Sequence, residues 1–153
     1  MDMKCLVACL GNPLMGDDGV GIAVASELAK LGYEAVVCGS DLSPVMARVE
    51  EVDVLIIVDA VDWGAKPGSV LTARLDELEE EPIRATHFLR VSEVIKLMRE
   101  AFGHPLEVYV VGIQPERVEP STELSPSVRR AVNDAVARVR ELLRRLQENR
   151  PNA

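Results

Sequence analysis

The sequence predicts a single three-layer α/β/α domain built around a mainly parallel central sheet. Two observations predict this fold: short, continuously apolar segments of strand length recur along the chain, and segments of helical periodicity separate most of them. Strands connected through helices pair in parallel and are covered on both faces, so they need no polar face. With 153 residues and 48% apolar content, the domain is expected to span residues 1–148, followed by a frayed tail at 149–153.

The order of the elements follows from the hydrophobic pattern. The predicted strands occupy residues 3–10, 34–38, 54–58, 69–75 and 108–111. The segment 54–58 is the most hydrophobic and is therefore expected at the centre of the sheet, whereas 69–75 alternates more and is expected at an edge. Helical periodicity predicts helices at residues 19–30, 43–49, 91–102 and 125–146. The acidic run at 76–81 is expected to be a solvated loop.

The predicted helix ends have recognisable signals. Ser43 and Ser125 are each followed by a proline, so each is expected to be an N-cap with proline at the first helical position. Gly32 is expected to end the first helix. The helix at 125–146 is the clearest prediction, because apolar residues recur along it at helical spacing.

Composition excludes several classes of function. The formal net charge of −8 opposes sequence-independent binding to nucleic acid. No run of about 18 apolar residues and no leader pattern is present, so a cytoplasmic protein without membrane segments is expected. From residue 125 onward, seven arginines face three acidic residues, and the simplest interpretation is a solvated helix face.

The loop after the first strand carries two adjacent acidic residues. Residues 11–21 read GNPLMGDDGVG, which lacks both common phosphate-binding glycine motifs, and its aspartates would repel a phosphate. Asp17 is interpreted as an N-cap of the following helix. Asp18 is then a second carboxylate where one cap suffices, which makes it a candidate ligand-binding residue.

Two further candidates follow other elements. Asp59 comes directly after the most apolar strand, where a carboxylate is costly unless it caps a loop or binds a cation. His87 precedes or begins the helix at 91–102, whereas His104 lies in a Gly-His-Pro turn and is interpreted as structural. In a parallel sheet, Asp18, Asp59 and His87 would converge at one edge. Two carboxylates and one imidazole suit a borderline divalent metal such as nickel or zinc.

The three cysteines, Cys5, Cys9 and Cys38, form no C-x-x-C pair. Cys5 and Cys9 are spaced to face the same side of a strand and are expected in the core. Cys38 has no charged neighbour that would create a reactive thiolate, and no serine-nucleophile motif is present. A hydrolase of this sequence would therefore act through a metal or a metal-bound water.

These motifs resemble those of the hydrogenase maturation proteases, in order and over nearly the whole chain. The matching segments are GNPL at 11–14 with DDGVG at 17–21, VDAV at 58–61 with PGSV at 67–70, TH at 86–87, GIQPE at 112–116 and ELSPSV at 123–128. The resemblance implies a phosphorylase/hydrolase-like fold. It also implies an endopeptidase that removes the C-terminal extension of a nickel-iron hydrogenase large-subunit precursor after nickel insertion.

The resemblance further implies a metal-contacting set at Asp18, Asp59 and His87, with the nickel supplied by the precursor. A monomer is expected, since a separate partner must reach the site. Two positions depart from the family pattern: Cys9 stands at a common glycine, and Cys38 stands where many members carry an aspartate. Two alternatives are a nickel-dependent chaperone that binds the precursor without cutting it, and an esterase resembling peptidyl-tRNA hydrolase.

Overall fold

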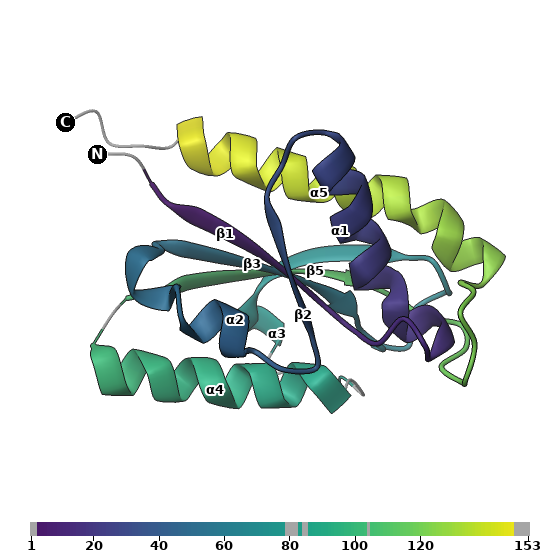
Figure 1. The fold of residues 1–153 in the computed structure, drawn as a ribbon, viewed down its shortest axis with the longest axis horizontal. Helices are drawn as coiled ribbons and strands as arrows, with labels where there is room; N and C mark the ends of the chain where they lie inside the picture. Colours follow the sequence, from purple (N-terminus) through teal and green to yellow (C-terminus); the bar gives the residue numbers. More distant parts are fainter. Residues whose placement is uncertain (1–2, 79–82, 84–85, 104, 149–153) are drawn as a thin grey trace.

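Five strands form one sheet with helices on both faces, as predicted (Figure 1). The computed structural model describes residues 3–78, 83, 86–103 and 105–148, with only the backbone described at 86–91, 102 and 148. The strand order is β2-β1-β3-β5-β4, so the chain places β2 on one side of β1 and then crosses over to place β3 on the other side. The predicted tail at 149–153 lies outside the described residues.

The sheet is parallel except at one edge. Parallel pairing joins β1 (Cys5–Leu10) to β2 (Ala35–Gly39) and to β3 (Val54–Ala60), and joins β3 to β5 (Glu107–Ile113). The edge strand β4 (Val70–Arg74) runs antiparallel to β5. All seven residues of β3 are buried, which confirms its predicted central position. The predicted edge position of β4 is also confirmed.

Two layers of helices cover the sheet (Figure 1). One face is covered by α1 (Val20–Lys30) and α5 (Pro126–Glu148), which pack against each other. The other face is covered by α2 (Ser43–Met46), α3 (Leu75–Leu78) and α4 (Thr86–Phe102). Short 3₁₀ helices, η1 (Gly16–Gly19) and η2 (Val49–Glu51), precede α1 and β3.

The long helix α5 confirms the clearest sequence prediction. Its apolar face is buried against the sheet through Val128, Val132, Ala135, Val136, Val139, Leu142 and Leu146. Pro126 is its first residue, as the sequence indicated. The predicted face of α4 is confirmed at Ile95 and Met98, which are buried, whereas the side chains of Val91 and Phe102 lie outside the described residues.

Two local predictions were wrong. Ser43 does not cap α2: it lies inside the helix, and its amide and hydroxyl both donate to Asp41 Oδ1, at 2.9 and 2.7 Å. Asp41 therefore accepts the hydrogen bonds at the start of α2, where Ser43 had been expected as the N-cap. The acidic run at 76–81 is not simply loop, because its first residues belong to α3, whose Leu75 and Leu78 are buried. Residues 79–81 lie outside the described part.

The carboxyl ends of the parallel strands lie along one side of the sheet, which is called the carboxyl edge and differs from the edge formed by strand β4. The loop at 11–19 follows β1 there, the loop at 61–69 follows β3, and the loop at 114–125 follows β5. Helix α4 also begins at this edge (Figure 1). Because binding sites of open parallel sheets form at this edge, these segments define where a site is expected.

Candidate active site

Asp59 lies in the penultimate position of the central strand and is completely buried. Its Oδ1 accepts a hydrogen bond from the backbone N of Ala60 at 2.8 Å, whereas its Oδ2 has no hydrogen-bond partner within the described part of the chain. Side chains alternate along a strand, so Asp59 points to the same face as Leu55 and Ile57, which is the face that α4 covers. A buried carboxylate oxygen without a partner is costly and needs an explanation.

Asp18 approaches Asp59 from the η1 helix. Asp18 is 9% exposed, and its Oδ2 accepts a hydrogen bond from the backbone N of Asn12 at 3.0 Å. The pKa of Asp59 is held well above its usual range, first by burial and then by the negative charge of Asp18. The structure therefore brings together two of the three predicted site residues.

His87 is the second residue of α4, whose first turn lies at the same edge of the sheet (Figure 1). Its side chain lies outside the described residues, so its approach to the two aspartates stays a prediction. Among the side chains that are described, no group of three possible metal ligands occurs.

Glycines allow the Asp18 loop to approach the sheet closely. A Cβ atom on Gly21 would lie 2.2 Å from the carbonyl oxygen of Leu10 and 2.9 Å from that of Val58, so α1 can pack this close to β1 and β3 only with glycine there. Gly11 has a φ of +131°, and a Cβ at this residue would lie 2.0 Å from the carbonyl oxygen of Asp18. The glycines of this segment thus allow the backbone of the Asp18 loop and α1 to pack closely against the strands that end near the two carboxylates.

Asp17 has a different function from the predicted one. It makes no capping hydrogen bond to η1 or α1. Its buried carboxylate instead accepts four hydrogen bonds from the loop at 114–125: from the backbone N of Glu116, Arg117 and Ser125 at 2.9, 2.9 and 2.7 Å, and from Ser125 Oγ at 2.8 Å. Burial alone would raise the pKa of Asp17, but these hydrogen bonds outweigh burial and lower it.

Gln114 is a site residue that the sequence analysis did not single out, although it stands in the GIQPE segment. Its Oε1 accepts hydrogen bonds from the backbone N of Trp63 and Ala65, and its Nε2 donates to Asp62 Oδ1 at 2.8 Å. Asp62 Oδ1 also accepts from the backbone N of Gly64, so Asp62 stabilises the turn after β3. Gln114 therefore fixes the loop that follows Asp59.

Cys9 and Cys38 are core residues, whereas Cys5, which was also expected in the core, is only partly buried. Cys9 is completely buried and Cys38 is 6% exposed. Burial, followed by the neighbouring Cys38 and Asp59, raises the pKa of Cys9 to about 12. Burial, followed by Asp41, raises the pKa of Cys38 to about 11. Both thiols are therefore neutral at pH 7, and the expectation of unreactive thiols agrees with their surroundings.

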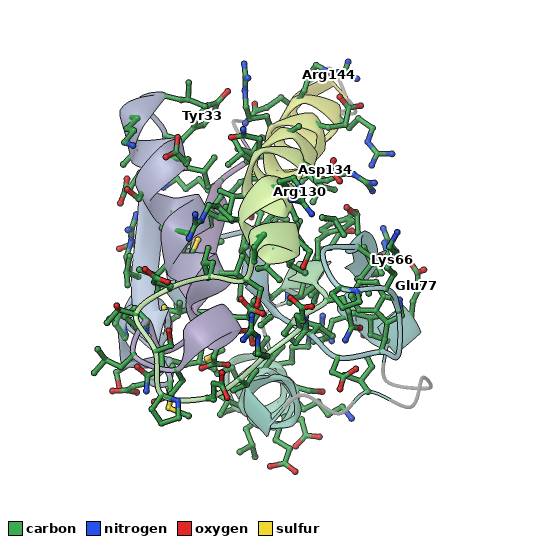
Figure 2. All side chains as sticks on the ribbon, turned by 90° about the vertical axis from the view of Figure 1, so that its right-hand side faces the viewer. Tyr33, Lys66, Glu77, Arg130, Asp134 and Arg144 are labelled. Atoms are coloured by element: carbon green, nitrogen blue, oxygen red, sulfur yellow. The ribbon has the colours of Figure 1, made fainter. Side chains whose placement is uncertain are left out.

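The arginines of α5 face solvent beside local partners. Figure 2 views the molecule from the carboxyl edge of the sheet and shows Arg130, Asp134 and Arg144 along this helix. Asp134 pairs with Arg138 at 3.4 Å, and Arg144 pairs with Glu141 at 2.6 Å. Exposed pairs of this kind contribute little to stability and reflect a solvated face, in agreement with the simplest sequence interpretation.

A hollow of about 310 Å³ opens between the loops at 11–19 and 114–125 and the start of α5. Its lining is mainly polar and carries both charges, with Arg117 and Arg129 beside Glu119 and Glu123. Small-molecule sites are usually apolar with a few polar groups, so this lining differs from that of a typical small-molecule site.

Comparison with known proteins decides the family. The sequence model of the hydrogenase maturation proteases matches residues 23–142. The chain belongs to the hydrogenase maturation protease family. It is 32% identical to the hydrogenase 3 maturation protease of Escherichia coli K12 over 121 residues, 76% of each chain. It is also 33% identical to protein FrxA of Pyrococcus furiosus over 135 residues, covering 85% of this chain and 98% of FrxA.

Solved structures agree with this assignment. The [NiFe] hydrogenase maturation protease HybD from Thermococcus kodakarensis superposes with a TM-score of 0.82 at 29% identity, over 92% of this chain and 99% of HybD. The hydrogenase maturating endopeptidase HybD of Escherichia coli gives 0.81 at 26% identity, over 94% and 93%. The predicted fold and the assignment as a maturation endopeptidase are thus confirmed. In the described residues, no helix has the length and apolar character needed to cross a membrane.

Proposed function

We propose that this endopeptidase removes the C-terminal extension of a nickel-iron hydrogenase large-subunit precursor after nickel insertion. Nickel already held by the precursor is the recognition element, and Asp18, Asp59 and His87 contact it. The observation that carries this proposal is the buried Oδ2 of Asp59, which has no hydrogen-bond partner among the described residues and lies near a second carboxylate.

The charge arrangement supports a cation at this position. Two nearby carboxylates repel each other when both are ionised, and burial disfavours the charged form further. A divalent metal removes both penalties, because it provides positive charge and a ligand position for the orphaned oxygen. An imidazole from the first turn of α4 would complete a donor set that suits a borderline metal such as nickel.

The chain's residues have separate tasks in this proposal. Asp59, held by the central strand and by the amide of Ala60, provides a fixed carboxylate. Asp18, held by the amide of Asn12, provides the second from a different element. These carboxylates would hold the nickel of a bound precursor, which would supply positive charge to polarise the scissile carbonyl or activate a water. Because the metal holds the precursor in one orientation, one bond is presented for cleavage and general proteolysis is avoided.

The surroundings of the site fit a protein substrate. The polar hollow beside η1 provides positively charged, negatively charged and hydroxyl side chains for a precursor segment. We further propose that the enzyme acts in the cytoplasm, and that it acts as a monomer, since a separate partner must reach the site. Family membership favours proteolysis over the esterase alternative, and the chaperone alternative becomes one outcome of the test.

The test is intact-mass analysis of a cognate large-subunit precursor after incubation with the enzyme, with nickel-loaded and nickel-free precursor in parallel. The expected result is loss of one C-terminal peptide from the nickel-loaded precursor alone, and no loss with the Asp18→Ala variant. An uncut precursor that co-elutes with the enzyme would instead support the chaperone function. Equal cleavage with and without nickel would overturn the recognition role of the metal.

A further inference from the structure

Asp17 joins the loop that carries Asp18 to a distant part of the chain. Its carboxylate is completely buried and, within the described part of the chain, accepts hydrogen bonds only from residues at 116–125; Ser125 lies 108 positions away in sequence. Both oxygens are used, Oδ1 by the amide of Ser125 and Oδ2 by two further amides and a hydroxyl. Charge-assisted hydrogen bonds of this kind are stronger than neutral ones, so the connection is firm.

Backbone contacts extend this connection along both loops. The amide of Asp17 donates to the carbonyl of Arg117 at 3.0 Å. Gly16 donates to the carbonyl of Ser121 at 2.8 Å, and Ser121 donates to the carbonyl of Leu14 at 3.0 Å. The loop at 11–19 and the loop at 114–125 are thus joined from Leu14 to Asp17.

The connection determines where Asp18 points. Asp17 and Asp18 are neighbours in η1, and a 3₁₀ helix has three residues per turn, so adjacent side chains point about 120° apart. When the carboxylate of Asp17 is fixed in the loop at 114–125, the rotation of η1 is fixed, and with it the direction of Asp18 toward Asn12 and Asp59.

We propose that Asp17 is a positioning residue of this protease, which orients the carboxylate of Asp18 without touching the substrate. The inference rests on the proposed function of Asp18. A displacement of about 1 Å in a reacting group can reduce a rate by about 100-fold. Release of η1 is therefore expected to lower the rate of cleavage in the enzyme–precursor complex more than it weakens binding of the precursor.

The test compares Asp17→Asn with Val139→Ala, which removes buried side-chain volume in the middle of α5, away from the loops. Cleavage of nickel-loaded precursor is measured at a temperature where both variants are folded to the same extent. Asp17→Asn is expected to lower kcat by about tenfold or more, with KM within about threefold, and Val139→Ala is expected to match the wild type.

A second readout does not depend on activity. The amide of Asn12 donates to Asp18, whereas the neighbouring amide of Gly11 donates to the carbonyl of Gly39 in β2. Hydrogen exchange in Asp17→Asn is expected to be faster at Asn12 and unchanged at Gly11. If Asp17→Asn fails to fold, Ser125→Ala, which removes one of the four hydrogen bonds, is expected to show the same two changes at smaller size.

Each outcome has a defined meaning. A wild-type kcat in Asp17→Asn, or activity losses in both variants that follow only the unfolded fraction, would overturn the positioning role. Unchanged exchange at Asn12 would do the same. If the wild-type enzyme fails to cut the nickel-loaded precursor, the proposed function fails, and the exchange experiment still decides whether Asp17 orients Asp18.

Discussion

The carboxylate of Asp18 lies close enough to that of Asp59 to add to the effect of burial on the pKa of Asp59. The two residues come from different elements, η1 and the central strand β3. Their proximity places an electrostatic penalty at the edge of the sheet where ligands of such folds bind. This repulsion lowers the free energy of unfolding of the protein, and the loss can be measured.

The Asp59→Asn variant is expected to be more stable than the wild type at pH 7 and inactive. The pKa of Asp59 is raised in the folded state, so its favourable contribution is complete below its unfolded value, near 4, and is lost as pH rises through the folded value. The gain in unfolding free energy should therefore grow with pH above about 4 and reach roughly 1 kcal/mol or more. Denaturant unfolding at several pH values measures it, with the exposed Asp134→Asn as control.

The two histidines allow a matched test of the third predicted ligand. His87→Ala is expected to abolish cleavage of nickel-loaded precursor, because it removes the imidazole that is proposed to contact the metal. His104→Ala is expected to leave the rate within about twofold, since the Gly-His-Pro sequence around His104 is interpreted as a structural turn without a role in cleavage. Single-turnover cleavage of the same precursor preparation compares them. A His87→Ala enzyme that cuts at the wild-type rate would remove His87 from the metal-contacting set.

Gly21→Ala is expected to destabilise the protein, contrary to the usual effect of this change in a helix. Alanine normally favours a helix by about 1 kcal/mol over glycine. At Gly21, however, the added carbon would lie 2.2 Å from a backbone oxygen of β1, so α1 must move away from the sheet. A net loss of about 2 kcal/mol is expected from thermal or denaturant unfolding. The exposed Ser26→Ala in the same helix is the control, and a stabilised Gly21→Ala would contradict the packing argument.

Alkylation tests whether a thiol participates in cleavage. Burial raises the pKa of Cys9 to about 12 and that of Cys38 to about 11, so few thiolates exist at pH 7.5. Iodoacetamide is expected to leave both residues unmodified in the folded enzyme and to modify them after denaturation, with activity retained in the folded sample. Peptide mass mapping measures the labelling. Rapid modification of Cys38 with loss of cleavage would give the thiol a functional role.

The sequence predicted those features that leave a regular pattern. Five apolar segments predicted the strands, and the strongest of them became β3 at the centre of the sheet. The spacing of valines and leucines predicted the buried face of α5. Asp18 and Asp59 could be placed at one edge, because the carboxyl ends of parallel strands lie together.

Of the features that were missed, one depends on contacts between distant residues and two depend on competing local signals. Asp17 has the local sequence of an N-cap, but its hydrogen-bond partners lie about a hundred positions away, and no periodicity reveals them. The turn at Asp41 was missed because Ser43 and Pro44 gave a competing local signal. The helical turn of α3 was hidden by its charges, although Leu75 and Leu78 are spaced for one buried side of a helix.

The separation of Asp17 from Ser125 also has a consequence for synthesis on the ribosome. The strand that supplies Asp59 and the loop that carries Asp18 are made early, but the amides that hold Asp17 belong to the last loop before α5. Until that loop has emerged, a nascent chain leaves the Asp17 carboxylate without these partners, and η1 is not held in place. If Asp17 orients Asp18 as proposed, the site acquires its fixed geometry only after the loop at 114–125 has been made, although both aspartates of the site are synthesised much earlier.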